Sequence, residues 1–247
     1  MSLKIIEEIS LKMTPSFKDI TYDGWVLKFF KKYFHKTNSI YPLNYGKINI
    51  NKKIEECENL YLKMGFSYAY RITPFSQPQN LDNKLNDKGF KKKFITRMLF
   101  LNLNDILLNS IKYSGITTDF EEWSQAYKFI GNFSDIESII HEDFHKFLSQ
   151  KKCLMLIKNK KKYISCGMGI INNDYFGIFD VKTNKDYQQK GYATELIKSM
   201  LLWAKQNKAK YVYLNVDNSN VPAYNLYYKI GFKEIYKYWF RIDKRFL

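Results

Sequence analysis

A polar turn with one glycine, residues 188–194 (QQKGYAT), holds the residue types best suited to chemistry. It follows an aromatic and β-branched run, residues 175–183, that predicts a buried strand. Apolar residues then recur every three or four positions over residues 193–204, which predicts a helix that begins at Gly191 or Tyr192. The first amides of a helix have no partner within it and lie at the positive end of its dipole. The turn therefore predicts a phosphate site, where Gly191 lets the backbone approach the ligand.

Two stretches of the sequence resemble one enzyme superfamily. The spelling Gln188-x-x-Gly191-x-Ala193 resembles the Q/R-x-x-G-x-G/A signature with which GCN5-related N-acetyltransferases (GNAT) bind the pyrophosphate of acetyl-CoA. The hexamer alone fits an ordinary loop between a strand and a helix equally well. A longer run from Asn220 to Phe232 resembles the N-x-x-A-x-x-L-Y-x-K-x-G-F ending of the same superfamily, at the spacing that the family shows. The resemblance is strong from about residue 120 to the end and looser before it.

The resemblance implies an acetyl-CoA-dependent N-acetyltransferase whose acceptor is an amine of a small molecule or peptide. The backbone of Val181 and Thr183 would pair with the pantetheine arm of CoA. The pyrophosphate would be held by the turn, which consists of Gln188, Gln189, Lys190, Gly191, Tyr192, Ala193 and Thr194. Asn220 would bond the pantetheine arm, cap the last helix, or do both.

Two residues are predicted to carry the chemistry. Tyr227 matches the tyrosine that protonates the departing thiolate in many GNAT enzymes, and a phenol is protonated at neutral pH. A core aromatic is the alternative for this position, because the chain has 20 tyrosines. The acceptor amine must lose a proton, and Asp180 lies where family members often place a carboxylate; a water relay, or an aspartate that is solvated or paired with lysine, is the alternative. No covalent enzyme intermediate is needed, so Cys153 and Cys166 are predicted to be buried hydrophobes.

The order helix, strand, helix, Gly-Phe, strand occurs twice, first over residues 54–103 and again from residue 192. This predicts an α/β fold with a mixed twisted sheet flanked by helices, in two GNAT-like domains. Residues 1–112 would form a degenerate first domain that helps to wall the acceptor site, and residues 113–247 the catalytic domain. Chance recurrence of a common pattern is the alternative. Where the second copy has the turn, the first has only residues 43–48 (LNYGKI), so we expect one CoA site per chain.

Composition favours a globular, cytoplasmic protein. Residues are 45% hydrophobic, which supplies a core, and neither a signal peptide nor a membrane-spanning run is apparent. The three widely spaced cysteines fit a reducing compartment. The formal net charge of +16 is mostly lysine spread along the chain, with little arginine, so we expect no nucleic-acid partner. The identity of the acceptor and the oligomeric state stay open.

A zinc-binding pattern and two other classes of function are alternatives to this interpretation. Residues 141–145 spell H-E-x-x-H, a zinc-binding pattern, but no histidine follows them and the chain has only 3, so no metal site is expected. A non-catalytic acyl-CoA sensor would need the turn but no acid at Tyr227. A nucleic-acid-binding module would bind DNA or RNA with a steep dependence on salt and would ignore CoA.

Overall fold

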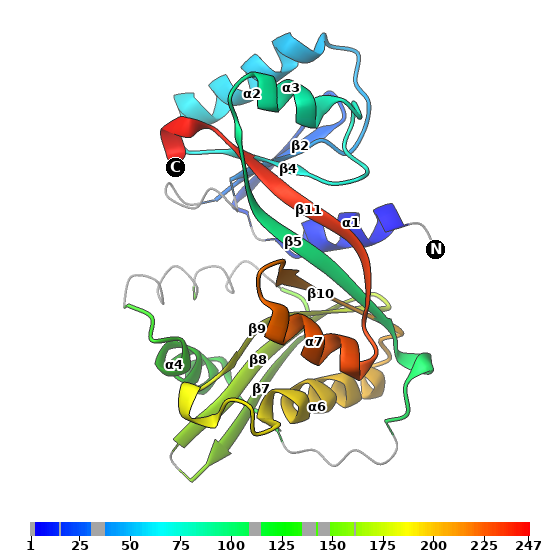
Figure 1. Cartoon of the computed structure of the whole chain (residues 1–247), viewed down its shortest axis with the longest axis vertical. Coiled ribbons are helices and arrows are strands. Elements are labelled where there is room, and N and C mark those ends of the chain that lie inside the picture. The colour runs from blue at the N-terminus through cyan, green and yellow to red at the C-terminus, as the bar shows by residue number, and fades with distance from the viewer. Residues whose placement is uncertain are drawn as a thin grey trace.

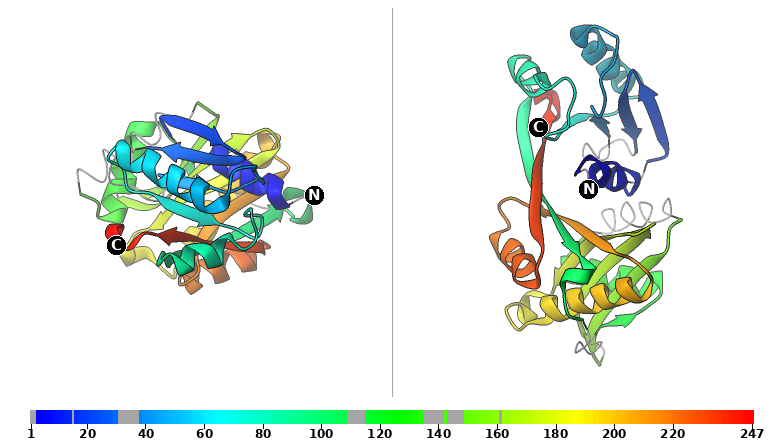
Figure 2. Two further views of the ribbon diagram at one scale, coloured as in Figure 1. Left: turned by 90° about the horizontal axis from the view of Figure 1, so that it is seen from above. Right: turned by 90° about the vertical axis from the view of Figure 1, so that its right-hand side faces the viewer.

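Two long strands, β5 (Lys91–Asn102) and β11 (Lys233–Ile242), run from one lobe of the molecule into the other (Figure 1). The structure is a computed structural model that describes residues 3–14, 16–30, 38–108, 115–134, 142, 149–160 and 162–247. Helix α1 (Leu3–Lys12) lies between the two lobes, as Figure 2 shows. In this part of the chain no helix is long and apolar enough to cross a membrane.

The strands described form one sheet in the order β1-β2-β3-β4-β11-β5-β10-β9-β8-β7-β6. The strands not yet given are β1 (Lys18–Tyr22), β2 (Trp25–Phe29), β3 (Ser39–Tyr41), β4 (Ala69–Ile72), β6 (Ile116–Thr117), β7 (Lys152–Asn159), β8 (Lys162–Asn172), β9 (Tyr175–Thr183) and β10 (Tyr211–Asp217). The helices that flank them are α2 (Ile50–Lys63), α3 (Leu81–Asp87), α4 (Phe120–Gly131), α6 (Tyr192–Gln206) and α7 (Val221–Ile230). The predicted fold class, a mixed sheet flanked by helices, is confirmed.

The elements α2, β4, α3 and β5 recur in the same order as α6, β10, α7 and β11. Both α3 and α7 end at a glycine with a left-handed backbone, Gly89 at φ +89° and Gly231 at φ +115°. The amide of the following phenylalanine reaches back five residues in each, from Phe90 to the Leu85 carbonyl (3.0 Å) and from Phe232 to the Tyr227 carbonyl (3.1 Å). Only glycine adopts this conformation without strain, so the Gly-Phe pair fixes the end of each helix.

The two halves exchange their last strands. β5 follows the amino-terminal half in sequence, yet it pairs antiparallel with β10 from Asn102 opposite Tyr211 to Thr96 opposite Asp217. β11 ends the chain, and its last residues pair antiparallel with β4, Trp239 opposite Ile72. Each half therefore completes the sheet of the other. The division into residues 1–112 and 113–247 stays a prediction about sequence units, because the sheet itself is continuous.

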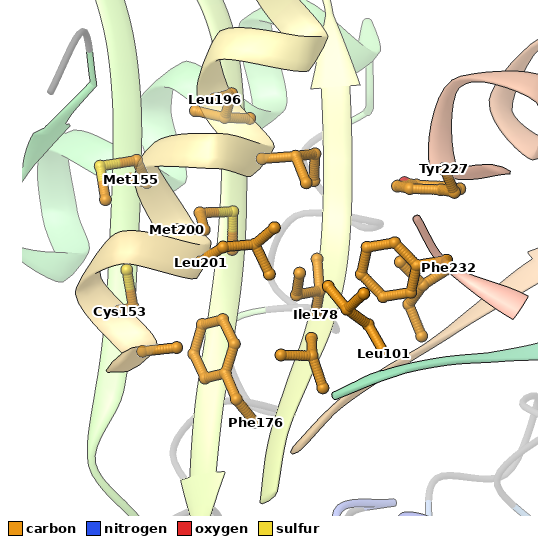
Figure 3. Close-up of a cluster of buried hydrophobic side chains, with 14 of the residues drawn as sticks. Leu101, Cys153, Met155, Phe176, Ile178, Leu196, Met200, Leu201, Tyr227 and Phe232 are labelled. Carbon is orange, nitrogen blue, oxygen red and sulfur yellow. The ribbon is translucent and has the colours of Figure 1, made fainter. Parts of the chain in front are cut away.

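Alternation along the strands places two hydrophobic clusters on opposite faces of the sheet. One face buries Leu99, Met155 and Ile178 beneath α6 and α7, and Figure 3 shows part of this cluster. The other face buries their neighbours Met98 and Leu154 against α4 and α1. A third cluster, which includes Trp25, Tyr61 and Tyr70, forms the core of the amino-terminal half.

Several element predictions differ from the structure. β1 was not predicted because three of its five residues are exposed and it shows no apolar run. α2 begins at Ile50 rather than Ile54, since Asn49 caps it by accepting a hydrogen bond from the Asn51 amide (3.0 Å). The sequence also predicts a helix over residues 135–148 and a strand over residues 35–41. Of these, residues 35–37, 135–141 and 143–148 lie outside the described residues.

Candidate active site

The turn predicted to bind phosphate leads directly from β9 into α6. A short 3₁₀ helix, Lys185–Tyr187, follows β9, and Gly191 is the N-cap of α6 with φ +88°. The backbone amides of residues 189–194 have no hydrogen-bond acceptor among the described residues. An added Cβ on Gly191 would meet nothing within 4 Å, so the turn faces open space. Free amides at the positive end of a 15-residue helix form an anion-binding cradle.

Side chains of the turn brace it and leave its amides free. Gln188 donates through Nε2 to the Thr183 carbonyl (3.3 Å), and Lys190 donates through Nζ to the Asp186 carbonyl (2.8 Å). Tyr187 and Tyr192 meet edge to face at 5.9 Å across the turn. We call residues 188–194 with these contacts the cradle.

Beside the cradle, the sheet opens between two parallel strands. β9 and β10 pair from Tyr175 opposite Tyr211 to Ile178 opposite Leu214, and no further. Beyond that point β9 pairs with β8 alone and β10 with β5 alone. A β-bulge lies where they part, since two residues of β9 face one residue of β8 and Asp180 has a left-handed φ of +55°. The opening exposes strand edges whose backbone can pair with an extended ligand.

The residues predicted to hold the pantetheine arm lie around this opening. Val181 and Thr183 are on the separated end of β9, and the Thr183 hydroxyl is 2.9 Å from that of Ser165 on β8. Asn220 caps α7, accepting a hydrogen bond from the Ala223 amide at 3.1 Å through Oδ1. The capping interpretation of Asn220 is thus confirmed, and its exposed amide group keeps two N–H donors for a ligand.

Tyr227 lies on the α7 side of the opening. Its ring is 7% exposed, packs against Phe232 at 5.8 Å, and lies beside β9 in Figure 3. The hydroxyl has no hydrogen-bond partner in the described part of the chain. Burial raises the pKa of Tyr227 to about 12, so the phenol is protonated at neutral pH. The residue is both a core aromatic and a free proton donor.

Asp180 lies on the opposite face of the sheet from Tyr227. Its carboxylate accepts a hydrogen bond from the Tyr127 hydroxyl of α4 (3.3 Å). Burial, and then the Asp180 charge, raise the pKa of Tyr127 far above its ordinary value, so Tyr127 remains the donor in this pair. The Lys182 ammonium lies over the Tyr127 ring at 5.6 Å. A carboxylate at this position can bind a cationic ligand or accept its proton.

Sequence reasoning missed Tyr127 as a partner of Asp180. The apolar spacing of Trp123, Ala126 and Tyr127 could have indicated a buried helix face, and these residues do face the sheet. The pairing itself joins positions 53 residues apart, and nothing in the local pattern points to it. Ser165 was missed for the same reason.

Only one residue of the zinc-like pattern, Glu142, is among the described residues, and Cys153 and Cys166 are buried. His141 and His145 lie outside the described residues, whereas Glu142 accepts a hydrogen bond from Ser124 of α4 (2.8 Å). Among the described residues no group of three ligand-type side chains could hold a metal ion. Burial raises the pKa of the Cys153 and Cys166 thiols to about 12, so they behave as hydrophobes.

Comparison with known proteins relates this chain to acetyltransferases of the GNAT type. Residues 117–232 match the model of the acetyltransferase (GNAT) family. An uncharacterized N-acetyltransferase, YobR of Bacillus subtilis (strain 168), is 23% identical over 98% of this chain and 99% of its own length.

Solved structures share the fold. A GCN5-related N-acetyltransferase from Kribbella flavida has a TM-score of 0.77 at 12% identity, over 99% of this chain and 96% of its own. A tandem GNAT protein from the clavulanic acid biosynthesis pathway has a TM-score of 0.63 at 8% identity, over 87% of this chain and 77% of its own. Over residues 117–232 the chain is therefore similar to the acetyltransferase (GNAT) family, and the solved structures show that it shares their fold.

Proposed function

We propose that the chain is a cytoplasmic, acetyl-CoA-dependent N-acetyltransferase that acetylates a primary amine of a small molecule or peptide by direct attack in a ternary complex. The observation that carries the proposal is the free amides of the cradle beside the opening between β9 and β10. A pyrophosphate and an extended pantetheine arm need these two features, side by side and in this order along β9. A dinucleotide would need a phosphate site but no opening between strands.

Each part of the thioester substrate has a matching group. The cradle amides and the dipole of α6 would bind the pyrophosphate. The pantetheine arm would pair with the backbone of Val181 and Thr183 and accept a hydrogen bond from the side-chain amide of Asn220. The acyl sulfur would then lie near the point where β9 and β10 part, between Tyr227 on one face of the sheet and Asp180 on the other.

The reaction requires two proton transfers and no enzyme-bound acyl group. The amine of the acceptor loses a proton to Asp180, directly or through water, and its nitrogen attacks the acetyl carbonyl carbon. The C–S bond breaks as the amide forms, and Tyr227 gives its proton to the departing thiolate. The products are the acetylated amine and CoA, and solvent returns the two enzyme groups to their starting states. Most of the rate enhancement comes from positioning, because the thioester is already activated.

The acceptor would approach from the face that carries Asp180. α1 and part of the amino-terminal half pack on that face, through Ile6, Met13 and Ala69. This arrangement supports the view that the amino-terminal half helps to wall the acceptor site. A primary amine arrives as an ammonium, which the Asp180 carboxylate attracts and then deprotonates.

Calorimetry with acetyl-CoA tests the proposal. Wild type should bind with saturation at one site per chain, and Gly191→Glu should abolish binding because it places a carboxylate at the cradle. Gly191→Asn is the matched control, since asparagine tolerates the left-handed φ of +88° and adds no charge. If acetyl-CoA does not bind wild type, or binds Gly191→Glu equally well, the proposal is wrong.

A non-catalytic acyl-CoA sensor is the alternative function. A sensor would bind acetyl-CoA at the same cradle but would release no CoA when amines are added. Release of CoA from acetyl-CoA, followed with a panel of simple amines, aminoglycosides, polyamines and peptides, separates the two and identifies the acceptor class.

A further inference from the structure

We propose that the amino-terminal half retains a counterpart of the cradle and that the carboxylate of Asp23 permanently fills it, so this half takes no CoA. In each half a strand leads through a loop into a helix, and that strand pairs in parallel with the strand that follows the helix: β3 with β4 around α2, and β9 with β10 around α6. The loop between β3 and α2 is therefore the structural counterpart of the cradle. This inference concerns a second site and does not rest on the proposed activity.

Asp23 sits in this loop as a phosphate would. Its carboxylate accepts hydrogen bonds from the amide of Lys47 (2.8 Å) and from that of Ile48 (3.1 Å), just before α2 begins. The Lys53 ammonium is 3.0 Å from the same carboxylate, and the Lys53 side chain is only 3% exposed. A Cβ on Gly46 would lie 1.9 Å from Asp23 Oδ2, so this glycine lets the backbone close around the carboxylate. Two amides and a buried ammonium around one anion form a built anion site.

The counterpart of Asp23 in the carboxyl-terminal half has the opposite charge. Asp23 is the first residue of a two-residue hairpin loop between Tyr22 and Trp25, with a left-handed φ of +45°. Lys160 is the first residue of the corresponding loop, between Asn159 and Lys162, with φ +53°. The carboxyl-terminal half, which is proposed to bind the pyrophosphate, thus has a cation at this turn. The amino-terminal half, which is proposed to bind no phosphate, has an anion there.

The amino-terminal half also has no proton donor at the position that corresponds to Tyr227. Counting back four residues from the glycine that ends each helix gives Tyr227 in α7 and Leu85 in α3. Leu85 is fully buried and cannot donate a proton. A filled cradle and a missing phenol are independent losses, and both indicate that the amino-terminal half performs no acyl transfer.

The competing explanation is that Asp23 merely ties its hairpin to α2. If Asp23 is only a tether, removal of its carboxylate creates no anion site. If Asp23 fills a cradle, removal of its carboxylate leaves an open site that can bind an anion. Asp23→Gly is the appropriate variant, because glycine keeps the left-handed turn and uncovers the amides. Asp19→Asn is the matched control: it removes a carboxylate of the same hairpin, one that pairs with Lys28 at 2.8 Å and touches no amide of the loop.

The test is a titration with inorganic phosphate, followed through the amide resonances of Lys47 and Ile48 in protein labelled with ¹⁵N-lysine and ¹⁵N-isoleucine. Asp23→Gly should show saturable shifts of both resonances, and wild type and Asp19→Asn should show none. The proposal is overturned if folded Asp23→Gly shows no shift, or if wild type shifts as much as the variant does. These resonances report on the loop alone, so the result is independent of whether acetyl-CoA binds at residues 188–194.

Discussion

The Tyr227 phenol combines a buried ring with a hydroxyl that has no partner in the described part of the chain, and it lies beside β9 at the opening of the sheet. Removing the hydroxyl should leave the packing against Phe232 intact. We expect Tyr227→Phe to lower kcat about a hundredfold or more, with the Kd for acetyl-CoA unchanged, because only the proton donor is lost. Rapid-mixing kinetics and calorimetry on the same preparation measure the two effects separately.

Tyr228→Phe is the control for this prediction, because Tyr228 lies on the same helix and is 64% exposed. The pH profile supplies a second readout. Burial raises the pKa of Tyr227 to about 12, which favours the protonated donor, so the rate should not fall on the alkaline side until the pH approaches that value. Full activity in Tyr227→Phe would remove this residue from the mechanism.

At the scale of single residues, the sequence predicts the chemical role of a residue more readily than it predicts the contacts of that residue. Gly191, Asn220 and Tyr227 could be assigned tasks because their types and spacing follow a pattern. The Tyr127–Asp180 pair and the bulge at Asp180 could not, because they depend on how β9 pairs with β8 and on which helix covers that face. Nor could Asp23 be recognised as the occupant of the loop between β3 and α2, since its amide partners lie 24 and 25 residues away.

At the scale of elements, the hairpin turn between β7 and β8 should act on CoA binding through its charge. Residue Asn184, at the start of the segment that leads to the cradle, donates its backbone amide to the Ile164 carbonyl of β8, so this turn and the cradle lie at the same end of the sheet. Lys160→Glu reverses a charge there, and we expect affinity for acetyl-CoA about tenfold lower at low ionic strength, with a smaller loss at high salt.

Lys208→Glu makes the same change in net charge just beyond the far end of α6 and is the control for Lys160→Glu. Calorimetry at two salt concentrations distinguishes the effect of the charge at this turn on acetyl-CoA affinity from the effect of the net charge of the protein. Equal losses in the two variants would mean that only the net charge matters, and an unchanged affinity in Lys160→Glu would mean that the turn does not face the phosphates.

Most helices and strands could be predicted from the sequence, because the regular spacing of apolar residues marks their extent and glycines mark several of their ends. β9 was predicted to the residue and the start of α6 to within one residue, and the Gly-Phe pairs marked the ends of α3 and α7. The pairing of β5 with β10 and of β11 with β4 was not predictable, because strand exchange leaves the order of elements unchanged. Both arrangements bury the same apolar residues, and only the three-dimensional sheet distinguishes them.

At the scale of the whole molecule, the exchange of β5 and β11 predicts that the two halves unfold together. Each half lacks one strand of its own, so neither can complete its sheet while the other is unfolded. The contact that fixes β11 in the amino-terminal half is Arg241, whose guanidinium donates to both carboxylate oxygens of Asp82 on α3 at 2.7 and 2.9 Å. Arg241 also donates to Asn86 Oδ1 at 3.0 Å and to the Phe90 carbonyl at 3.1 Å.

Arg241→Leu should therefore destabilise the entire chain. Loss of one partner from a largely buried pair costs about 3 kcal/mol, which corresponds to a decrease in Tm of about 6 to 12 °C for a chain of this size. Hydrogen exchange should show equal loss of protection in β2 and β8, one strand from each half. Arg245→Leu is the control, because the Arg245 side chain is 56% exposed and its ion pair with Asp243 is worth about 1 kcal/mol or less. Loss of protection in β2 alone would show that the halves unfold independently.

The same variant has a defined dependence on pH. Burial opposes ionisation of Asp82, but the hydrogen bonds from Arg241 and Trp239 outweigh it and lower the pKa of this carboxyl below its ordinary value. A carboxyl whose pKa is lower in the folded state stabilises the fold above the unfolded-state pKa of about 4, and this stabilisation is lost as the pH falls through the folded-state value. The difference in Tm between wild type and Arg241→Leu should be complete at neutral pH and shrink below about pH 4. Calorimetric scans from neutral to acidic pH measure it, and a difference that persists undiminished in acid would mean that Arg241 acts through Asn86 and the Phe90 carbonyl rather than through its ion pair with Asp82.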